Sequence, residues 1–96
     1  MATRRDRTPT GTTSVADLVD AGVLVVGDEL KIKSMKYGTM TATVTAEGHI
    51  RFGGIGYLTP TAAAKAALRI SNVDGWIRWR PTRLDGWTLA ELRQTV

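Results

Sequence analysis

Arginine and tryptophan are concentrated in one short segment. Residues 74–80 read DGWIRWR and hold two of the three tryptophans and two arginines. A guanidinium group binds phosphate through paired hydrogen bonds, and an indole ring offers a flat surface on which a base can stack. If Asp-Gly forms a turn and a strand follows it, Trp76, Arg78 and Arg80 share one face of that strand. This pattern favours nucleic-acid binding.

The two tryptophans of this segment also have a structural explanation. The chain contains a single phenylalanine, so tryptophan must supply part of the large apolar volume of the core. We expect one of Trp76 and Trp79 in the core and the other partly exposed, and the pattern leaves open which is which. The exposed ring would stack on a base or line a pocket for a methylated base. Trp87 is expected in a turn beside the last helix.

A second candidate site is the start of an alanine-rich helix. Thr59 is a residue type that caps helices, and Pro60 suits the first helical position because its missing N–H is not needed there. Free backbone N–H groups and the hydroxyls of Thr59 and Thr61 can hold a phosphate, although a capped helix without a ligand explains the same residues. Lys65 and Arg69 lie one helical turn apart, and an anionic partner would relieve their repulsion. With Arg51 added for non-specific attraction, the candidate DNA-binding residues are Arg78, Arg80, Trp76, Trp79, Thr59, Thr61, Lys65, Arg69 and Arg51.

The residues for a catalytic or metal site are missing from the sequence. His49 is the single histidine and there is no cysteine, so neither a metal cluster nor a nucleophile with its base can be assembled. The carboxylates stand at expected caps and turns. The glycine-rich run 53–56 is not followed by the Lys-Ser/Thr pair of a phosphate loop. We therefore expect no enzymatic activity, no cofactor and no metal.

Size and composition indicate one small soluble domain with an anionic partner. The chain has 96 residues, of which 43% are hydrophobic, and its net charge is +4. The lack of cysteine fits a reducing compartment, no apolar run approaches the length of a membrane span, and the N-terminus does not read as a signal peptide. We expect a cytoplasmic protein without membrane contact, associated with the nucleoid in a bacterium or located in the host cytoplasm if a phage encodes it.

The elements that would position these residues predict an α+β fold. Residues 1–13 contain three arginines and almost no apolar side chain, which favours a flexible arm, either a solvated tail or an extension along phosphates. Residues 14–96 then form the single domain. Apolar periodicity and capping residues predict helices at 15–21 and 60–69 and around Leu89 and Leu92.

Strands are expected at 29–35, 39–46, 49–52, 57–58 and 76–80. The glycines of 53–56 are expected to break the ladder with a bulge or bend. The expected architecture is a small, mainly antiparallel sheet of about four to five strands with three short helices.

Six short motifs occur in an order that is familiar from a known domain. They are AGVL at 21–24 with GDEL at 27–30, TATV at 41–44, EGHI at 47–50, TPTAAA at 59–64, DGWIRW at 74–79 and GWTLAELR at 86–93. Their succession, over about residues 15–93, resembles the restriction enzyme adenine methylase associated domain, abbreviated RAMA. Domains of this family are usually fused to adenine methyltransferases, restriction enzymes or other effectors.

The resemblance implies a stand-alone DNA-binding module that is accessory to a bacterial or phage DNA-modification or restriction system. Its expected partner is double-stranded DNA, with a preference for methylated adenine. The alternative is a protein–protein interaction module that docks a partner or a second copy without touching DNA. The family more often has Asn where this chain has Asp74, and a carboxylate accepts hydrogen bonds without donating them. This difference argues for a turn-forming role of Asp74 rather than a base contact.

Overall fold

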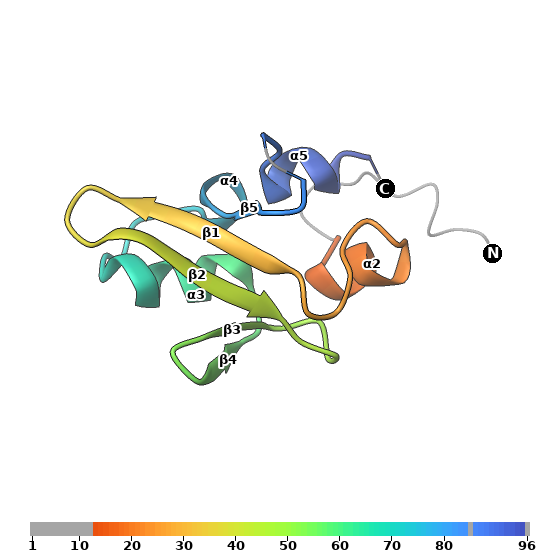
Figure 1. Cartoon of the computed structure of the whole chain (residues 1–96), viewed down its shortest axis with the longest axis horizontal. Helices are drawn as coiled ribbons and strands as arrows, with labels where there is room; N and C mark the ends of the chain where they lie inside the picture. The colour runs from red at the N-terminus through yellow and green to blue at the C-terminus, as the bar shows by residue number, and fades with distance from the viewer. Residues whose placement is uncertain (1–12, 85, 96) are drawn as a thin grey trace.

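The computed structural model describes residues 13–84 and 86–95, which form a sheet with short helices packed around it (Figure 1). The sheet is five-stranded and antiparallel, with the strand order β4-β3-β2-β1-β5. The strands are β1 (Glu29–Ser34), β2 (Gly38–Val44), β3 (Ile50–Phe52), β4 (Ile55–Tyr57) and β5 (Arg80–Pro81). The helices are α2 (Val15–Asp20), α3 (Pro60–Leu68), α4 (Gly75–Arg78) and α5 (Leu89–Arg93). The predicted α+β class is confirmed, with four helices among the described residues instead of three.

The β1–β2 hairpin dominates the sheet, and its sequence sorts side chains between two faces. Leu30 and Ile32 of β1 are buried, while the lysines that follow them are exposed. In the register of the hairpin, Leu30 lies opposite Ala42 and Ile32 opposite Met40. Because successive side chains of a strand point to opposite faces, one face of the sheet is apolar and the other is polar.

A single core fills the space between the apolar face of the sheet and the helices. Helix α3 contributes Ala63, Ala64 and Ala67, whose small side chains let its backbone approach β3 and β4 closely. Trp79 is the largest fully buried side chain. Local signals set the helix ends, because Ser14 forms a capping box with Asp17 and the Thr59 hydroxyl accepts the N–H of Ala62.

The expected strand at 76–80 is wrong, because most of that segment is the one-turn helix α4. The Asp74 carboxylate accepts the N–H of Trp76 at 3.0 Å and caps the helix instead of opening a strand. A Cβ on Gly75 would overlap the carbonyl of Pro60, so the first turn of α4 presses directly on the start of α3. Extended backbone resumes at β5, where Arg80 lies opposite Lys31.

Smaller differences concern the glycines and the two ends of the domain. Gly53 and Gly54 have positive φ values of 61° and 83° and form the β3–β4 turn, whereas Gly56 continues the ladder opposite Arg51 instead of breaking it. Thr13, the last residue of the predicted arm, is buried at 4% exposure. The rest of that arm, residues 1–12, lies outside the described residues. In the part of the chain that the structure describes, every helix falls short of the length and apolarity needed to cross a membrane.

Candidate nucleic-acid interface

The polar face of the sheet carries a row of cations and hydroxyl groups. Lys31 lies opposite Thr41 on one side and Arg80 on the other, Lys33 lies opposite Thr39, and Arg51 lies opposite Thr43. Residues directly opposite each other in an antiparallel pair project to the same face, so four strands contribute to one surface. All of these side chains are exposed. We call this surface the cationic sheet face, and it comprises Lys31, Lys33, Arg51, Arg80, Thr39, Thr41 and Thr43.

The cationic sheet face continues into an open groove of about 800 Å³. Four cations line the groove: Lys31 and Lys33 from β1, Arg80 from β5 and Arg78 from α4. The rest of the lining consists of the hydroxyl-bearing Thr39 and Thr82, the half-exposed apolar side chain of Ile77, and Pro81 and Gly86. We call it the cationic groove.

The described residues around the groove compensate little of its charge. Within residues 13–84 and 86–95, none of its four cations forms an ion pair. The Arg80 guanidinium reaches the carbonyl of Gly86 at 3.4 Å, which is a long hydrogen bond. Glu29 is the acidic residue on the same face of β1, and its carboxylate accepts the hydroxyl of Thr82 at 2.8 Å. Four like charges in one concave surface create a potential that attracts an anion.

Neither tryptophan of the segment 74–80 offers a free ring to a base. Trp79 is fully buried, its Nε1 donates to the Pro60 carbonyl at 3.0 Å, and its ring packs beside Phe52 with centroids 6.5 Å apart. Trp76 is half-buried, and the Arg93 guanidinium lies 3.8 Å above its ring. One core and one partly exposed tryptophan were expected, and Trp79 is the core residue. The half-exposed indole at the surface is Trp87, with 47% of its area accessible.

The candidate residues of the alanine-rich helix split between structural contacts and a different surface. The Thr59 hydroxyl caps its own helix, and the Thr61 hydroxyl accepts the N–H of Gly75 at 3.0 Å, so both are used in joining α3 to α4. Lys65 is exposed on α3, which covers the opposite face of the sheet. Arg69 ends α3, and its guanidinium lies 5.5 Å from the ring of Tyr37. The structure therefore brings Arg78, Arg80 and Arg51 to one side of the molecule and leaves Lys65 on the other.

The structure adds Lys31 and Lys33 to the candidate site. A signal for them exists in the sequence, because they alternate with Leu30 and Ile32 and must project away from the core. Their relevance depends on β5 lying beside β1, which brings Arg80 across from Lys31. That pairing joins residues about 50 positions apart and has no local signature.

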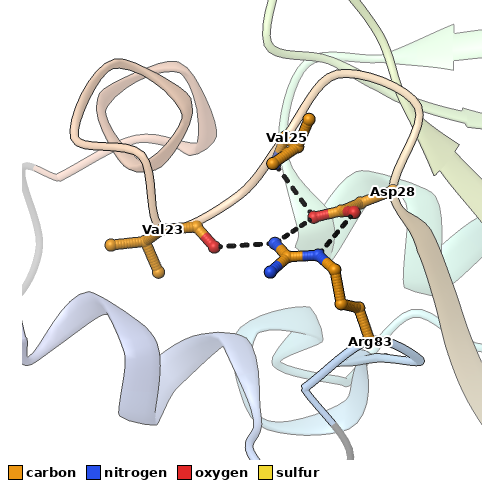
Figure 2. Close-up of polar contacts among 4 residues, drawn as sticks. All are labelled: Val23, Val25, Asp28 and Arg83. Carbon is orange, nitrogen blue, oxygen red and sulfur yellow. Dashed lines mark hydrogen bonds and ion pairs between the residues drawn. The ribbon is translucent and has the colours of Figure 1, made fainter.

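An ion pair holds the segment after β5 against the loop that precedes β1 (Figure 2). The Arg83 guanidinium donates from Nε to Asp28 Oδ1 at 3.0 Å and from Nη2 to Asp28 Oδ2 at 2.7 Å, and Nη2 also reaches the Val23 carbonyl at 3.1 Å. Asp28 accepts the N–H of Val25 as well, at 2.9 Å. These hydrogen bonds, above all those from Arg83, lower the pKa of Asp28 against the opposing effect of its partial burial. The same pair raises the pKa of Arg83 and fixes the residue next to Thr82 in the groove wall.

Comparison with known proteins assigns the chain to a family. No curated protein and no solved structure matches it. The model of the family described as Restriction Enzyme Adenine Methylase Associated matches residues 1–96, the whole of the given chain. That description ties the family to restriction–modification systems. The chain therefore belongs to the RAMA family, as its succession of motifs indicated.

Proposed function

We propose that this RAMA domain binds double-stranded DNA through the cationic sheet face and the cationic groove, as an accessory module of a restriction–modification system. The observation that carries the proposal is the convergence of Lys31, Lys33, Arg78 and Arg80 on one open groove. Arginine and lysine that meet phosphates supply most of the affinity of DNA-binding proteins and set their register on the duplex.

The spacing of these cations suits a phosphate backbone. Lys31 and Lys33 stand two residues apart on β1, which separates them by about 6.6 Å along the strand. That distance is close to the rise of two nucleotides, since each nucleotide of a strand advances the duplex by about 3.4 Å. The hydroxyls of Thr39 and Thr41 on the neighbouring strand are further phosphate donors. Arg51, two strands away from β1, extends the contact across the sheet.

A preference for a methylated base would depend on the apolar part of the groove. Ile77 is 54% exposed and lines the groove together with the four cations. Aliphatic side chains read base methyl groups in the major groove by direct contact. The carboxylate of Asp74 is occupied as the cap of α4, which supports assigning base contact to Ile77 rather than to that residue.

A different surface favours the alternative of protein docking. Strand β4 is an edge of the sheet, and residues 52–59 around it carry no charge. Ile55 and Leu58 are 58% and 72% exposed there. Uncharged edge strands with exposed apolar side chains are typical sites of strand addition by a partner chain.

Fluorescence anisotropy with labelled duplexes over a salt series tests the DNA-binding proposal. Four phosphate contacts predict that the logarithm of the association constant falls with the logarithm of salt concentration with a slope of about −4. Adenine-methylated and unmodified duplexes of one sequence measure the preference for a methyl group.

The variant Lys33→Ala should weaken binding to every sequence and reduce the steepness of the salt dependence by about 1. Lys65→Ala is the matched control, because it removes the same charge from the opposite side of the molecule and should leave the slope unchanged. Equal losses in the two variants would mean that net charge, and not the groove, attracts DNA. Absence of binding to all duplexes at low salt would remove the proposal and favour docking at β4.

A further inference from the structure

The turn between β1 and β2 presents a fully exposed methionine, and hydrogen bonds to Ser34 support the turn. Met35 has a relative accessibility of 107%, so its side chain contacts nothing else in the described structure. The Ser34 hydroxyl accepts the N–H groups of Lys36 at 3.1 Å and Tyr37 at 3.0 Å, and Gly38 completes the turn with φ of 79°. These hydrogen bonds fix the turn that carries Met35. The side chain is held outward although it contributes nothing to the core.

Positive charge lies on both sides of this methionine. Lys33 belongs to the cationic sheet face, two residues before Met35. On the other side of the turn, Lys36 Nζ and the Arg69 guanidinium each lie 5.5 Å from the Tyr37 ring. Figure 1 shows that the C-terminal end of α3, which precedes Arg69, lies at the same end of the molecule as the β1–β2 turn. The result is one apolar tip between cations that come from the two faces of the sheet.

Arg69 has an unusual backbone conformation for an arginine. Arg69 caps α3 in the left-handed conformation, with φ of 58° and ψ of 41°, and no other non-glycine residue in 13–84 and 86–95 has a positive φ. Glycine adopts this conformation at lower cost and is the usual residue at such a position. The chain keeps a guanidinium group beside the hairpin turn in spite of that cost.

We propose that Met35 is a wedge that enters the minor groove of duplex DNA, inserts between two base pairs and bends the duplex. Two phosphate backbones border the minor groove. Lys33 would lie against one of them, and Lys36 and Arg69 would lie against the other. Apolar side chains inserted from the minor groove unstack a base step, widen the groove and kink the duplex by roughly 20–90°. The proposal rests on the proposed function, because it needs a duplex seated on the cationic sheet face.

Geometry and charge favour DNA as the occupant of this site. Met35 follows directly after the end of β1 and lies two residues beyond Lys33, so a duplex held in the cationic groove lies close to the turn. An apolar side chain between two groups of cations is complementary to the minor groove, because base edges form the bottom of the groove and phosphates line both of its edges. A protein partner would have to supply acidic residues on both sides of an apolar pocket.

Two signals from one duplex test the wedge with the intact chain. Donor and acceptor dyes at the duplex ends report bending, and 2-aminopurine at a central step reports unstacking. We expect wild type to raise energy transfer and 2-aminopurine fluorescence. Met35→Ala should lose most of both signals with at most about a tenfold loss of affinity and an unchanged salt slope. Met35→Leu should retain both signals, because leucine is also an apolar wedge.

The control is Leu58→Ala, which removes another strongly exposed apolar side chain, at the β4 edge. The Leu58→Ala variant should bend DNA as much as wild type does. If wild type binds duplexes with a steep salt dependence but neither bends nor unstacks them, or if Met35→Ala bends them equally, the wedge is wrong while the proposed function stands. If wild type binds no duplex at low salt, both proposals fail.

Discussion

At the scale of single residues, the charge of Asp28 is the one most clearly coupled to folding. Its pKa is lowered, chiefly by the hydrogen bonds from Arg83 (Figure 2). A carboxyl group whose pKa is lower in the folded state stabilises the fold above its unfolded pKa, near 3.8, and this stabilisation disappears as pH falls through the lowered value. We therefore expect Asp28→Asn to be less stable than wild type near neutral pH and to lose less stability on acidification. Urea midpoints of both proteins, measured from neutral to strongly acidic pH, check this.

Asp20→Asn is the control for this pH dependence. Asp20 is exposed at the end of α2, and no hydrogen bond to its side chain is found among the described residues. The stability of this variant should depend on pH as that of wild type does, because the Asp28–Arg83 pair is present in both proteins. If the urea midpoints of wild type and Asp28→Asn changed with pH in parallel, a role of the Asp28–Arg83 pair in folding would be contradicted.

At the scale of elements, the contact between the starts of α3 and α4 places two arginines in the groove. Gly75 touches Pro60 so closely that a Cβ would overlap the carbonyl. We expect Gly75→Ala to reduce the free energy of unfolding by about 2–3 kcal/mol, because helix or loop must move to accept the methyl group. Urea unfolding measures the loss. DNA binding of the folded fraction should weaken too, since Arg78 and Arg80 follow this contact in the chain.

Gly56→Ala provides the matched control for the α3–α4 contact. A Cβ at Gly56 would meet its nearest neighbour, the His49 ring, at 3.8 Å, which is an ordinary contact. Its effect on the free energy of unfolding should stay within about 0.5 kcal/mol. Similar losses for both glycine variants would mean that α3 and α4 adjust freely and do not fix the groove.

These contacts explain which elements could be predicted from the sequence. The capped start of α3 and the alternation of β2 are local patterns, and the structure confirms both within one or two residues. Helix α4 has a single turn and therefore no periodicity to detect. Besides the Asp74 cap, a hydrogen bond from Trp79 Nε1 to the Pro60 carbonyl, 19 residues away, joins the end of α4 to the start of α3. An Asp-Gly pair followed by alternating residues favoured a strand, and the tertiary contact reversed that preference.

The candidate site was predictable by residue type but not by geometry. The residue types of Arg78, Arg80 and Arg51 predict phosphate contacts, and the structure places all three on one side of the molecule. Lys31 and Lys33 alternate with the apolar Leu30 and Ile32 in the sequence, yet only the pairing of β5 with β1 shows that they meet the arginines. Trp79 and Thr61 carry suitable groups, but both are used in holding α3 to α4.

At the scale of the whole molecule, the distribution of charge matters more than its sum. The net charge is +4, which alone would attract an anion to any side. The cationic sheet face and the groove gather five cations, Lys31, Lys33, Arg51, Arg78 and Arg80, on the side of the sheet that the core leaves uncovered. This distribution favours a partner that covers the polar face of the sheet, with Arg69 at the end of α3 reached only beyond the β1–β2 turn.

NMR titration of the ¹⁵N-labelled chain with a short duplex tests this one-sidedness. We expect the amide signals of β1, β2 and β5 to shift, and those of the β1–β2 turn and of Arg69 to shift if the wedge forms. The signals of Lys65 and of the first turns of α3 should stay in place. The same titration at high salt should abolish the shifts, because phosphate contacts dominate the binding. Shifts centred on Ile55 and Leu58 would place the interface at the β4 edge and support the alternative that this edge is a binding surface for partners. Shifts spread evenly over both sides of the sheet would show that the cations act through net charge alone.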